Sequence, residues 1–205
     1  MNKQIVGILL AGGQSRRMGG GDKCLRPLGD RTILGHVIDR IRPQVGPLIL
    51  NANGDPDRFR SYGLPVVADV VDGFAGPLAG VLTGLRWAEI NAPRCAWMLS
   101  VPTDAPFVPQ NLATSLRQEI SVQGAQLACA TSRGRPHPVV GLWPVALADA
   151  LEQALVGEDI RKIDHWTARY RLVEVSFDDT GFDPFFNANR PEDLAMAERL
   201  LAGER

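Results

Sequence analysis

The chain has 205 residues, a length that suits one large domain covering residues 1–205. Hydrophobic residues make up 45% and charged residues 22%, the proportions of an ordinary globular protein. The formal net charge is −1, which excludes a general attraction to nucleic acids or membrane surfaces, so any anion site must be a local basic cluster.

The N-terminal segment and the cysteines favour a cytoplasmic protein. The apolar run from Ile5 to Ala11 is too short to span a bilayer, and no small-residue cleavage pattern follows it. The three cysteines are odd in number and widely spaced, so we expect neither a disulfide framework nor a zinc site. A reducing cytoplasm is the simplest setting for such a chain.

Short apolar runs predict the strands of the protein. Most runs are continuously apolar, which is typical of strands covered on both faces in an α/β sheet. In chain order they are Ile5–Leu10, Leu48–Asn51, Val66–Ala68, Ala96–Val101, Leu127–Thr131, Val139–Leu142 and Leu172–Val175.

Between these runs, apolar residues recur at the spacing of helices. The predicted helices begin after Thr32, Pro77, Pro109, Ala146 and Arg190. We expect Thr32 to cap the first helix and Asn189 to cap the last one. The alternation predicts a mostly parallel sheet with helices on both faces and right-handed crossovers. Ligands of such sheets bind beyond the carboxyl ends of the strands, here just after Leu10, Asn51, Ala68 and Val101.

A glycine-rich segment from Leu10 to Lys23 follows the first strand directly. Its glycines allow backbone N–H groups to approach phosphate oxygens, and Arg16, Arg17 and Lys23 add positive charge. The spacing matches neither a Walker A loop nor a dinucleotide-binding loop. We interpret the segment as a phosphate-binding loop; the alternative is a surface loop with solvated charges.

The same segment resembles a known family. Leu-Ala-Gly-Gly, a short gap, Arg-Met-Gly-Gly, one residue and Asp-Lys form the opening signature of the molybdenum cofactor guanylyltransferases. Further matching motifs occur in order along nearly the whole chain: Asn51-Ala52-Asn53, Asp69, Gly76-Pro77-Leu78-Ala79-Gly80, Asp104-Ala105-Pro106-Phe107, His137-Pro138 and Phe186 to Leu194. The resemblance implies a Rossmann-like nucleotidyltransferase that transfers GMP from GTP to molybdopterin carrying molybdenum, with release of pyrophosphate.

The resemblance also implies roles for individual residues. Asp104 matches the position that binds both nucleotide and Mg²⁺, and Lys23 matches the phosphate-binding lysine. The remaining positions implied to bind GTP are Leu10, Ala11, Gly12, Gly13, Asn51 and Asp69.

The chemistry of nucleotidyl transfer suits these residue types. Negative charge builds on the leaving pyrophosphate, so catalysis is mainly positioning and charge neutralisation. Mg²⁺ prefers one or two carboxylates with phosphate oxygens, which favours Asp104 as its ligand over a plain turn residue. Lys23 can follow the leaving phosphates, and Arg17 is a candidate second clamp. The attacking phosphate is already ionised, so no general base is expected.

The acceptor site is expected in the second half of the chain. Molybdopterin carries a phosphate and a polar pterin, so its site should offer cations and amides. Arg135 and His137 lie in what we expect to be a rigid basic loop, Arg133 to Pro138, where a plain turn is the alternative for His137. Asn187 is the remaining candidate on this side.

Several other functions remain open from the sequence. A cytidylyltransferase relative tends to have Leu-Ala-Ala-Gly where this chain has Leu-Ala-Gly-Gly, and the missing Cβ at Gly12 and Gly13 leaves room for a purine. A sugar-phosphate nucleotidyltransferase would carry Gly-x-Gly-Thr-Arg, which is absent. A non-catalytic adaptor that binds GTP and pterin is the alternative from a different class. For a molybdenum cofactor guanylyltransferase we also expect proteins that mature molybdoenzymes as partners.

Overall fold

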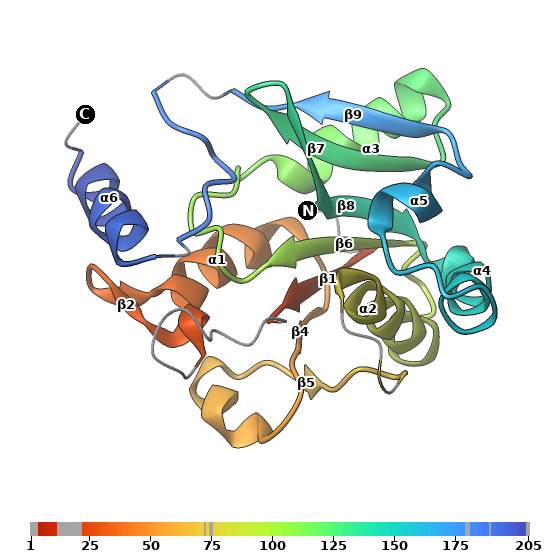
Figure 1. Cartoon of the computed structure of the whole chain (residues 1–205), viewed down its shortest axis with the longest axis horizontal. Helices are drawn as coiled ribbons and strands as arrows, with labels where there is room; N and C mark the ends of the chain where they lie inside the picture. Colours follow the sequence, from red (N-terminus) through yellow and green to blue (C-terminus); the bar gives the residue numbers. More distant parts are fainter. Residues whose placement is uncertain are drawn as a thin grey trace.

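The computed structural model describes residues 4–11, 22–71, 73, 76–178, 181–188 and 190–203. Its centre is a seven-stranded sheet in the order β5-β4-β1-β6-β8-β7-β9, which runs through the whole molecule in Figure 1. The strands are β1 (Ile5–Leu10), β4 (Leu48–Asn51), β5 (Val66–Val67), β6 (Trp97–Pro102), β7 (Leu127–Ser132), β8 (Arg135–Pro144) and β9 (Leu172–Ser176). A separate small hairpin joins β2 (Pro27–Leu28) to β3 (Arg31–Thr32).

The strands of the sheet are parallel with one exception. β1 pairs in parallel with β4 and β6, β4 with β5, and β7 with β9. Only β8 runs antiparallel to both of its neighbours, β6 and β7. The prediction of a mostly parallel α/β sheet is therefore confirmed.

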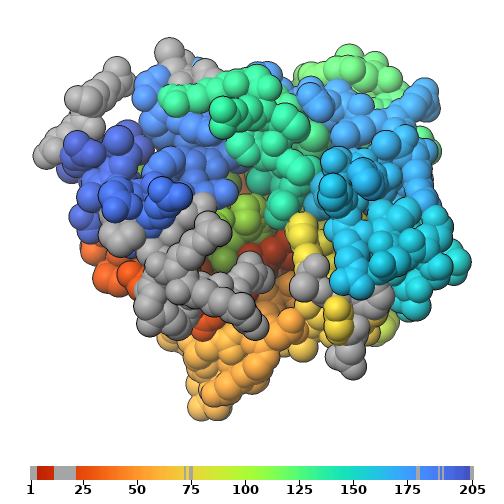
Figure 2. Space-filling model, in the orientation of Figure 1, coloured from red at the N-terminus to blue at the C-terminus, as the bar shows by residue number. Residues whose placement is uncertain are grey.

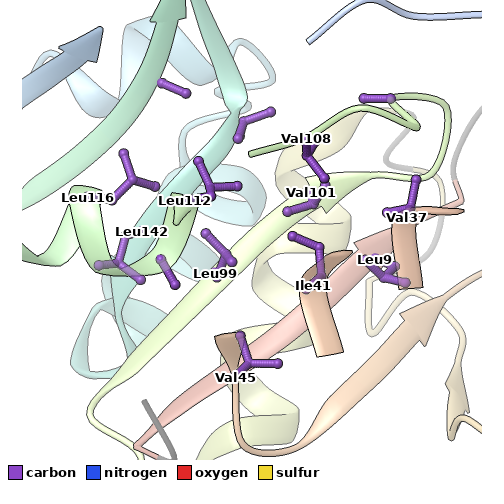
Figure 3. Close-up of a cluster of buried hydrophobic side chains, with 14 of the residues drawn as sticks. Leu9, Val37, Ile41, Val45, Leu99, Val101, Val108, Leu112, Leu116 and Leu142 are labelled. Atoms are coloured by element: carbon purple, nitrogen blue, oxygen red, sulfur yellow. The ribbon is translucent and has the colours of Figure 1, made fainter. Parts of the chain in front are cut away.

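Helices cover both faces of the sheet, as predicted. α1 (Ile33–Ile41) and α3 (Leu112–Gln123) pack on one face, where their apolar side chains meet those of β1, β6 and β8 (Figure 3). α2 (Pro77–Asn91), α4 (Ala148–Glu152) and α5 (Ile163–Thr167) cover the other face. Because both faces are covered, β1 and β4 are buried at every position, which explains their continuously apolar sequences.

The chain order creates a switch point between β1 and β6. β4 lies on one side of β1 and β6 on the other, and the helices that follow β1 and β5 cover opposite faces. In α/β sheets the crevice at such a point, outside the carboxyl ends of the strands, is where ligands bind. Figure 2 shows the surface hollowed beside α2, with atoms in the colours of β1 and β6 at its base.

The prediction of a basic loop from Arg133 to Pro138 is wrong. Residues from Arg135 onward belong to β8, and the connection to β7 is a two-residue turn of Arg133 and Gly134. Both turn residues have positive φ, 50° and 68°, the conformation that matches the twist of a two-residue hairpin. The ladder shifts register between Cys129 and Ala130, so β8 bulges near Pro138.

The C-terminal part forms a third apolar cluster. α6 (Pro191–Leu201) packs with the β2–β3 hairpin and with the segment 181–188 that crosses toward it. Its N-cap is Arg190, one residue later than the predicted Asn189, and the Asp193 side chain accepts a hydrogen bond from the Arg190 backbone N–H. No helix in the described ranges is long and apolar enough to cross a membrane.

Candidate active site

An ion pair marks the crevice between β1 and β6. The Lys23 ammonium lies 2.8 Å from Oδ2 of Asp104, and the two side chains are 14% and 26% exposed. Lys23 is separated from Asp104 by 81 positions in the sequence, so only the fold brings them together. The pair places one cation and one carboxylate at the edge of the sheet where a ligand is expected.

Local packing holds both partners of this ion pair. Lys23 begins a short 3₁₀ helix, Lys23–Leu25, whose Cys24 is buried beside Thr103. Thr103 in turn donates its backbone N–H to the Leu10 carbonyl oxygen at 3.2 Å, which extends the β1–β6 ladder to the residue before Asp104. Burial raises the pKa of the Cys24 thiol to about 11, so this cysteine anchors the segment and is no nucleophile.

The second carboxylate oxygen of Asp104 is available for a ligand. Oδ1 is buried and has no hydrogen-bond partner among the described residues. The Asp104 carbonyl oxygen accepts the Ala188 N–H at 3.0 Å, which ties the segment 181–188 to this corner. A buried carboxylate oxygen without a partner is costly, and a bound cation would remove that cost.

A network of amides surrounds Asp69 at the ends of β4 and β5. The Asn51 amide donates to Oδ1 of Asp69 at 2.9 Å, and the Asn53 amide donates to Oδ2 at 2.8 Å. The Asp69 backbone N–H returns a hydrogen bond to Oδ1 of Asn53 at 2.9 Å. These bonds fix the orientation of the Asp69 carboxylate while leaving lone pairs on both of its oxygens.

Two further residues support this network. Gly80 of α2 lies so close to β4 that a Cβ there would be 2.5 Å from Oδ1 of Asn51. Arg58 donates to the Asn53 carbonyl oxygen at 2.7 Å and its Nε lies 2.5 Å from Oδ2 of Asp22. Arg58 thus connects the strand-end network to the residue that precedes Lys23.

The N-terminal end of β8 reaches the same edge of the sheet, because this strand alone is reversed. His137 lies there with Nε2 at 2.7 Å from the Ser132 hydroxyl, which donates to Oδ1 of Asp183 at 2.7 Å. The His137 ring packs on Phe185 with their centroids 4.7 Å apart. This group links the β7–β8 hairpin to the segment that also contacts Asp104.

The structure brings the described candidates to one edge of the sheet. Lys23, Asp104, Asn51 and Asp69 lie on the side of β1, β4 and β6, together with the strand end Leu10-Ala11. Arg135 and Asn187 are exposed on the other side of the same edge, and their side chains make no hydrogen bond to the described residues. Three predicted residues, Gly12, Gly13 and Arg17, lie outside the described residues.

Sequence reasoning missed four members of this edge. Asn53 could have been found, since it lies two residues after Asn51 and faces the same side of an extended segment. Ser132, Asp183 and Arg58 gave no such signal, because their partners are distant in the sequence or are backbone atoms.

Fold and site together define the class of protein. A doubly wound sheet with a lysine and an aspartate at its switch point is an arrangement for binding a nucleotide through its phosphates. The profile of the family described as MobA-like NTP transferase domain matches residues 7–173 of the chain. The chain is thus a nucleotidyltransferase.

Individual relatives narrow this class. The molybdenum cofactor guanylyltransferase of Nitrobacter hamburgensis is 56% identical over 196 residues, which are 96% of this chain and 94% of that protein. The enzyme of the same name from Bradyrhizobium sp. is 54% identical over 98% of this chain and 94% of its own length. The chain belongs to the family of molybdenum cofactor guanylyltransferases. The crystal structure of molybdopterin-guanine dinucleotide biosynthesis protein A from Archaeoglobus fulgidus, 23% identical, has the same fold with a TM-score of 0.76 over 97% of this chain and 99% of that one.

Proposed function

We propose that this protein transfers GMP from GTP to molybdopterin that carries molybdenum, giving the guanine dinucleotide form of the cofactor and pyrophosphate. The observation that carries the proposal is the ion pair of Lys23 and Asp104 at the switch point of the sheet. A nucleoside triphosphate with its Mg²⁺ presents the complementary charges, negative oxygens for the ammonium and a cation for the carboxylate. The names of the relatives support guanine as the base.

The donor side neutralises charge on the phosphates. Transfer breaks the bond between the α- and β-phosphates, and negative charge grows on the leaving pyrophosphate. Lys23 has a flexible stem and a compact charge, so its ammonium can follow the departing oxygens. We assign Arg17 as a second clamp on the same phosphates.

Asp104 is the residue that would hold Mg²⁺. Its buried Oδ1 has no partner among the described residues, and no group of three or more His, Cys, Asp or Glu side chains in the described ranges forms an alternative site. One carboxylate is sufficient, because Mg²⁺ is commonly held by one or two carboxylates together with substrate phosphates and water. When bound, the ion supplies positive charge to the phosphate oxygens.

The network around Asp69 suits guanine. Guanine presents two adjacent donors, its ring N1–H and its 2-amino group, and a carboxylate accepts from both. Cytosine presents one amino donor beside an unprotonated ring nitrogen, which a carboxylate repels. Asn51 and Asn53 hold the carboxylate in place for this selection. The other positions that we assign to GTP are Leu10, Ala11, Gly12 and Gly13.

The acceptor side supplies binding groups rather than a base. The nucleophile is a phosphate monoester with a second pKa of about 6, so it is largely dianionic at neutral pH. Arg135 offers a cation, and His137 and Asn187 offer hydrogen bonds, at the same edge of the sheet as Asp104. The donor and acceptor sides thus lie on either side of the crevice.

We place the reaction in the cytoplasm and expect its product to pass to proteins that mature molybdoenzymes. The assignment to the cytoplasm is supported by the three cysteines, which are free and buried, as in a protein kept in a reducing environment.

One incubation tests the proposed reaction. Purified protein is mixed with molybdopterin, molybdate, Mg²⁺ and one of GTP, CTP or ATP, and both pyrophosphate and the nucleotide on the pterin are identified. We expect pyrophosphate release and a guanine product with GTP alone. A cytosine product would make the protein a cytidylyltransferase, and binding of GTP and pterin without pyrophosphate would make it an adaptor.

The division into donor and acceptor sides predicts a separable effect. Arg135→Ala and Asn187→Ala should each weaken molybdopterin binding and leave GTP affinity nearly unchanged, because both side chains lie on the β8 side of the edge. Calorimetric titration with each ligand measures this, with Arg60→Ala as the control at an exposed arginine outside the site. A loss of GTP affinity with pterin binding intact would show that the division is wrong.

A further inference from the structure

A hydrogen-bonded chain of three side chains lies at the acceptor side. It runs from His137 on β8 through the Ser132 hydroxyl at the end of β7 to Asp183, with both contacts at 2.7 Å. Oδ1 of Asp183 also accepts the Phe185 N–H at 2.9 Å, which closes a turn in the segment 181–188. Ser132 is 1% exposed, so water cannot easily replace these partners.

The direction of the hydrogen bonds follows from the chemistry of the groups. The ionised Asp183 carboxylate can only accept, so the Ser132 hydroxyl donates its one proton to Asp183. The hydroxyl oxygen must then accept from Nε2–H of His137. A neutral His137 therefore carries its proton on Nε2, and its Nδ1 is an acceptor that makes no hydrogen bond to any described residue.

We infer that His137 acts as a neutral hydrogen-bond acceptor, whose Nδ1 binds an N–H group of the pterin ring, while the phosphate of the acceptor is left to Arg135. Ser132 and Asp183 are positioning residues that select this tautomer. The inference rests on the proposed function, since it takes a pterin as the acceptor.

The surroundings of His137 favour its neutral form. Burial against Phe185 and the hairpin lowers the pKa of His137, and the carboxylate of Asp183 opposes this with a smaller effect. Arg135 lies two residues away on the same face of β8, so a cation for the phosphate of the acceptor is close to His137.

The arrangement is not a hydrolytic triad. In such a triad the carboxylate binds the histidine, and the histidine takes the proton of the serine. Here the carboxylate holds the proton of Ser132 directly, and histidine is at the end of the chain. Ser132 is therefore a relay between two side chains and not a nucleophile.

Nitrogen NMR of histidine-labelled protein tests the tautomer without any substrate. We expect His137 at neutral pH to show protonated Nε2 and unprotonated Nδ1, and Ser132→Ala to abolish this preference. The signal is assigned by its loss in His137→Asn, with the exposed His165→Asn as the matched control. Protonation of Nδ1 at neutral pH in the wild type would overturn the inference, whatever reaction the protein catalyses.

Binding of metal-free molybdopterin as a function of pH tests the partner. The measured quantity is the ratio of the Kd of His137→Leu to that of the wild type, in which the titration of the ligand's phosphate cancels. We expect a ratio of roughly 2 to 10 at about pH 8, which is the contribution of one hydrogen bond, and a smaller ratio once the pH falls below the pKa of His137. His137→Asn, whose amide oxygen can replace Nδ1, should recover part of the affinity and lose the pH dependence. A ratio that grows as the pH falls would assign an imidazolium to the phosphate and refute the inference.

Discussion

At the scale of single residues, the two charges at the switch point have different tasks. Asp104 combines a buried oxygen that lacks a partner among the described residues with a neighbouring oxygen bound to Lys23. The first oxygen favours a cation and the second keeps the lysine in place. Their separate effects on turnover and on affinity can be measured.

Asp104→Asn should lower turnover by about 10²–10³ while the protein stays folded. The amide keeps the shape of the side chain but removes the negative charge that we propose for binding Mg²⁺, and loss of one group that stabilises a developing charge typically has this effect. Pyrophosphate release at limiting Mg²⁺ is the measurement, and Asp57→Asn on the separate 3₁₀ helix Pro56–Tyr62 is the control, since the Asp57 side chain is exposed. Turnover within a few-fold of wild type would remove Asp104 from the mechanism.

Lys23→Ala should weaken GTP binding as well as turnover, because the ammonium contacts phosphates in the ground state and in the transition state. A charge-assisted hydrogen bond contributes about 1.5–3 kcal/mol, so we expect about 10- to 100-fold weaker binding. Calorimetric titration with GTP gives the affinity directly. An unchanged Kd would mean that Lys23 serves only to neutralise Asp104.

At the scale of elements, α2 packs so closely on the sheet that two of its glycines have no room for a side chain. A Cβ on Gly80 would meet Oδ1 of Asn51, which is anchored by hydrogen bonds, whereas a Cβ on Gly84 would meet the apolar side chains of Ile8 and Met98. An added methyl group would therefore disturb a polar side chain of the site at Gly80, but only apolar side chains at Gly84.

Gly80→Ala and Gly84→Ala should both destabilise the protein, by about 1–3 kcal/mol each, since both overpack the interface of α2 with the sheet. Only Gly80→Ala should also weaken GTP binding, because it displaces Asn51 from Asp69. Urea denaturation and GTP titration of the two variants separate the effects. Equal GTP affinity in both would show that Asn51 is not needed for the nucleotide.

The elements also show what a sequence can predict. β1 and β4 match their predicted bounds, because a strand that is buried on both faces has an unbroken run of apolar residues between turn residues. The first half of β8 was missed because Pro136 and Pro138 argue against a strand. They are tolerated since β8 pairs with β6 only as far as Gly141, so beyond it the strand has a partner on one side alone.

The residues of the site also divide into those that the sequence predicted and those that it did not. Lys23, Asn51, Asp69 and Asp104 were predicted because they match motifs of the family that the sequence resembles. Ser132 and Asp183 were not, because they are 51 positions apart and meet only when β7, β8 and the segment after β9 are assembled.

At the scale of the whole molecule, the neutral His137 makes stability depend on pH. Its pKa is lowered in the folded state, so between the folded and unfolded pKa values the unfolded chain binds more protons. The stability that His137 contributes is therefore present above the unfolded pKa of about 6.5 and is lost as the pH falls below it.

We predict that the difference in urea midpoint between the wild type and His137→Gln changes in favour of the variant as the pH falls from about 7.5 to about 5.5. The physical reason is that glutamine takes up no proton on unfolding. His165→Asn, at a histidine whose side chain is exposed, is the control. A flat difference for His137→Gln would contradict the lowered pKa.

The reversal of β8 has a consequence for how such a protein can change its substrates over generations. Every strand on the side that we assign to the nucleotide ends at the crevice, whereas the side that we assign to the acceptor is a hairpin closed by Arg133 and Gly134. An insertion at that two-residue tip would lengthen the hairpin and leave β1, β4 and β6 in register. We therefore expect that specificity for the acceptor and specificity for the nucleotide can evolve separately. A library of lengthened hairpins is the direct way to engineer a nucleotidyltransferase for a larger acceptor.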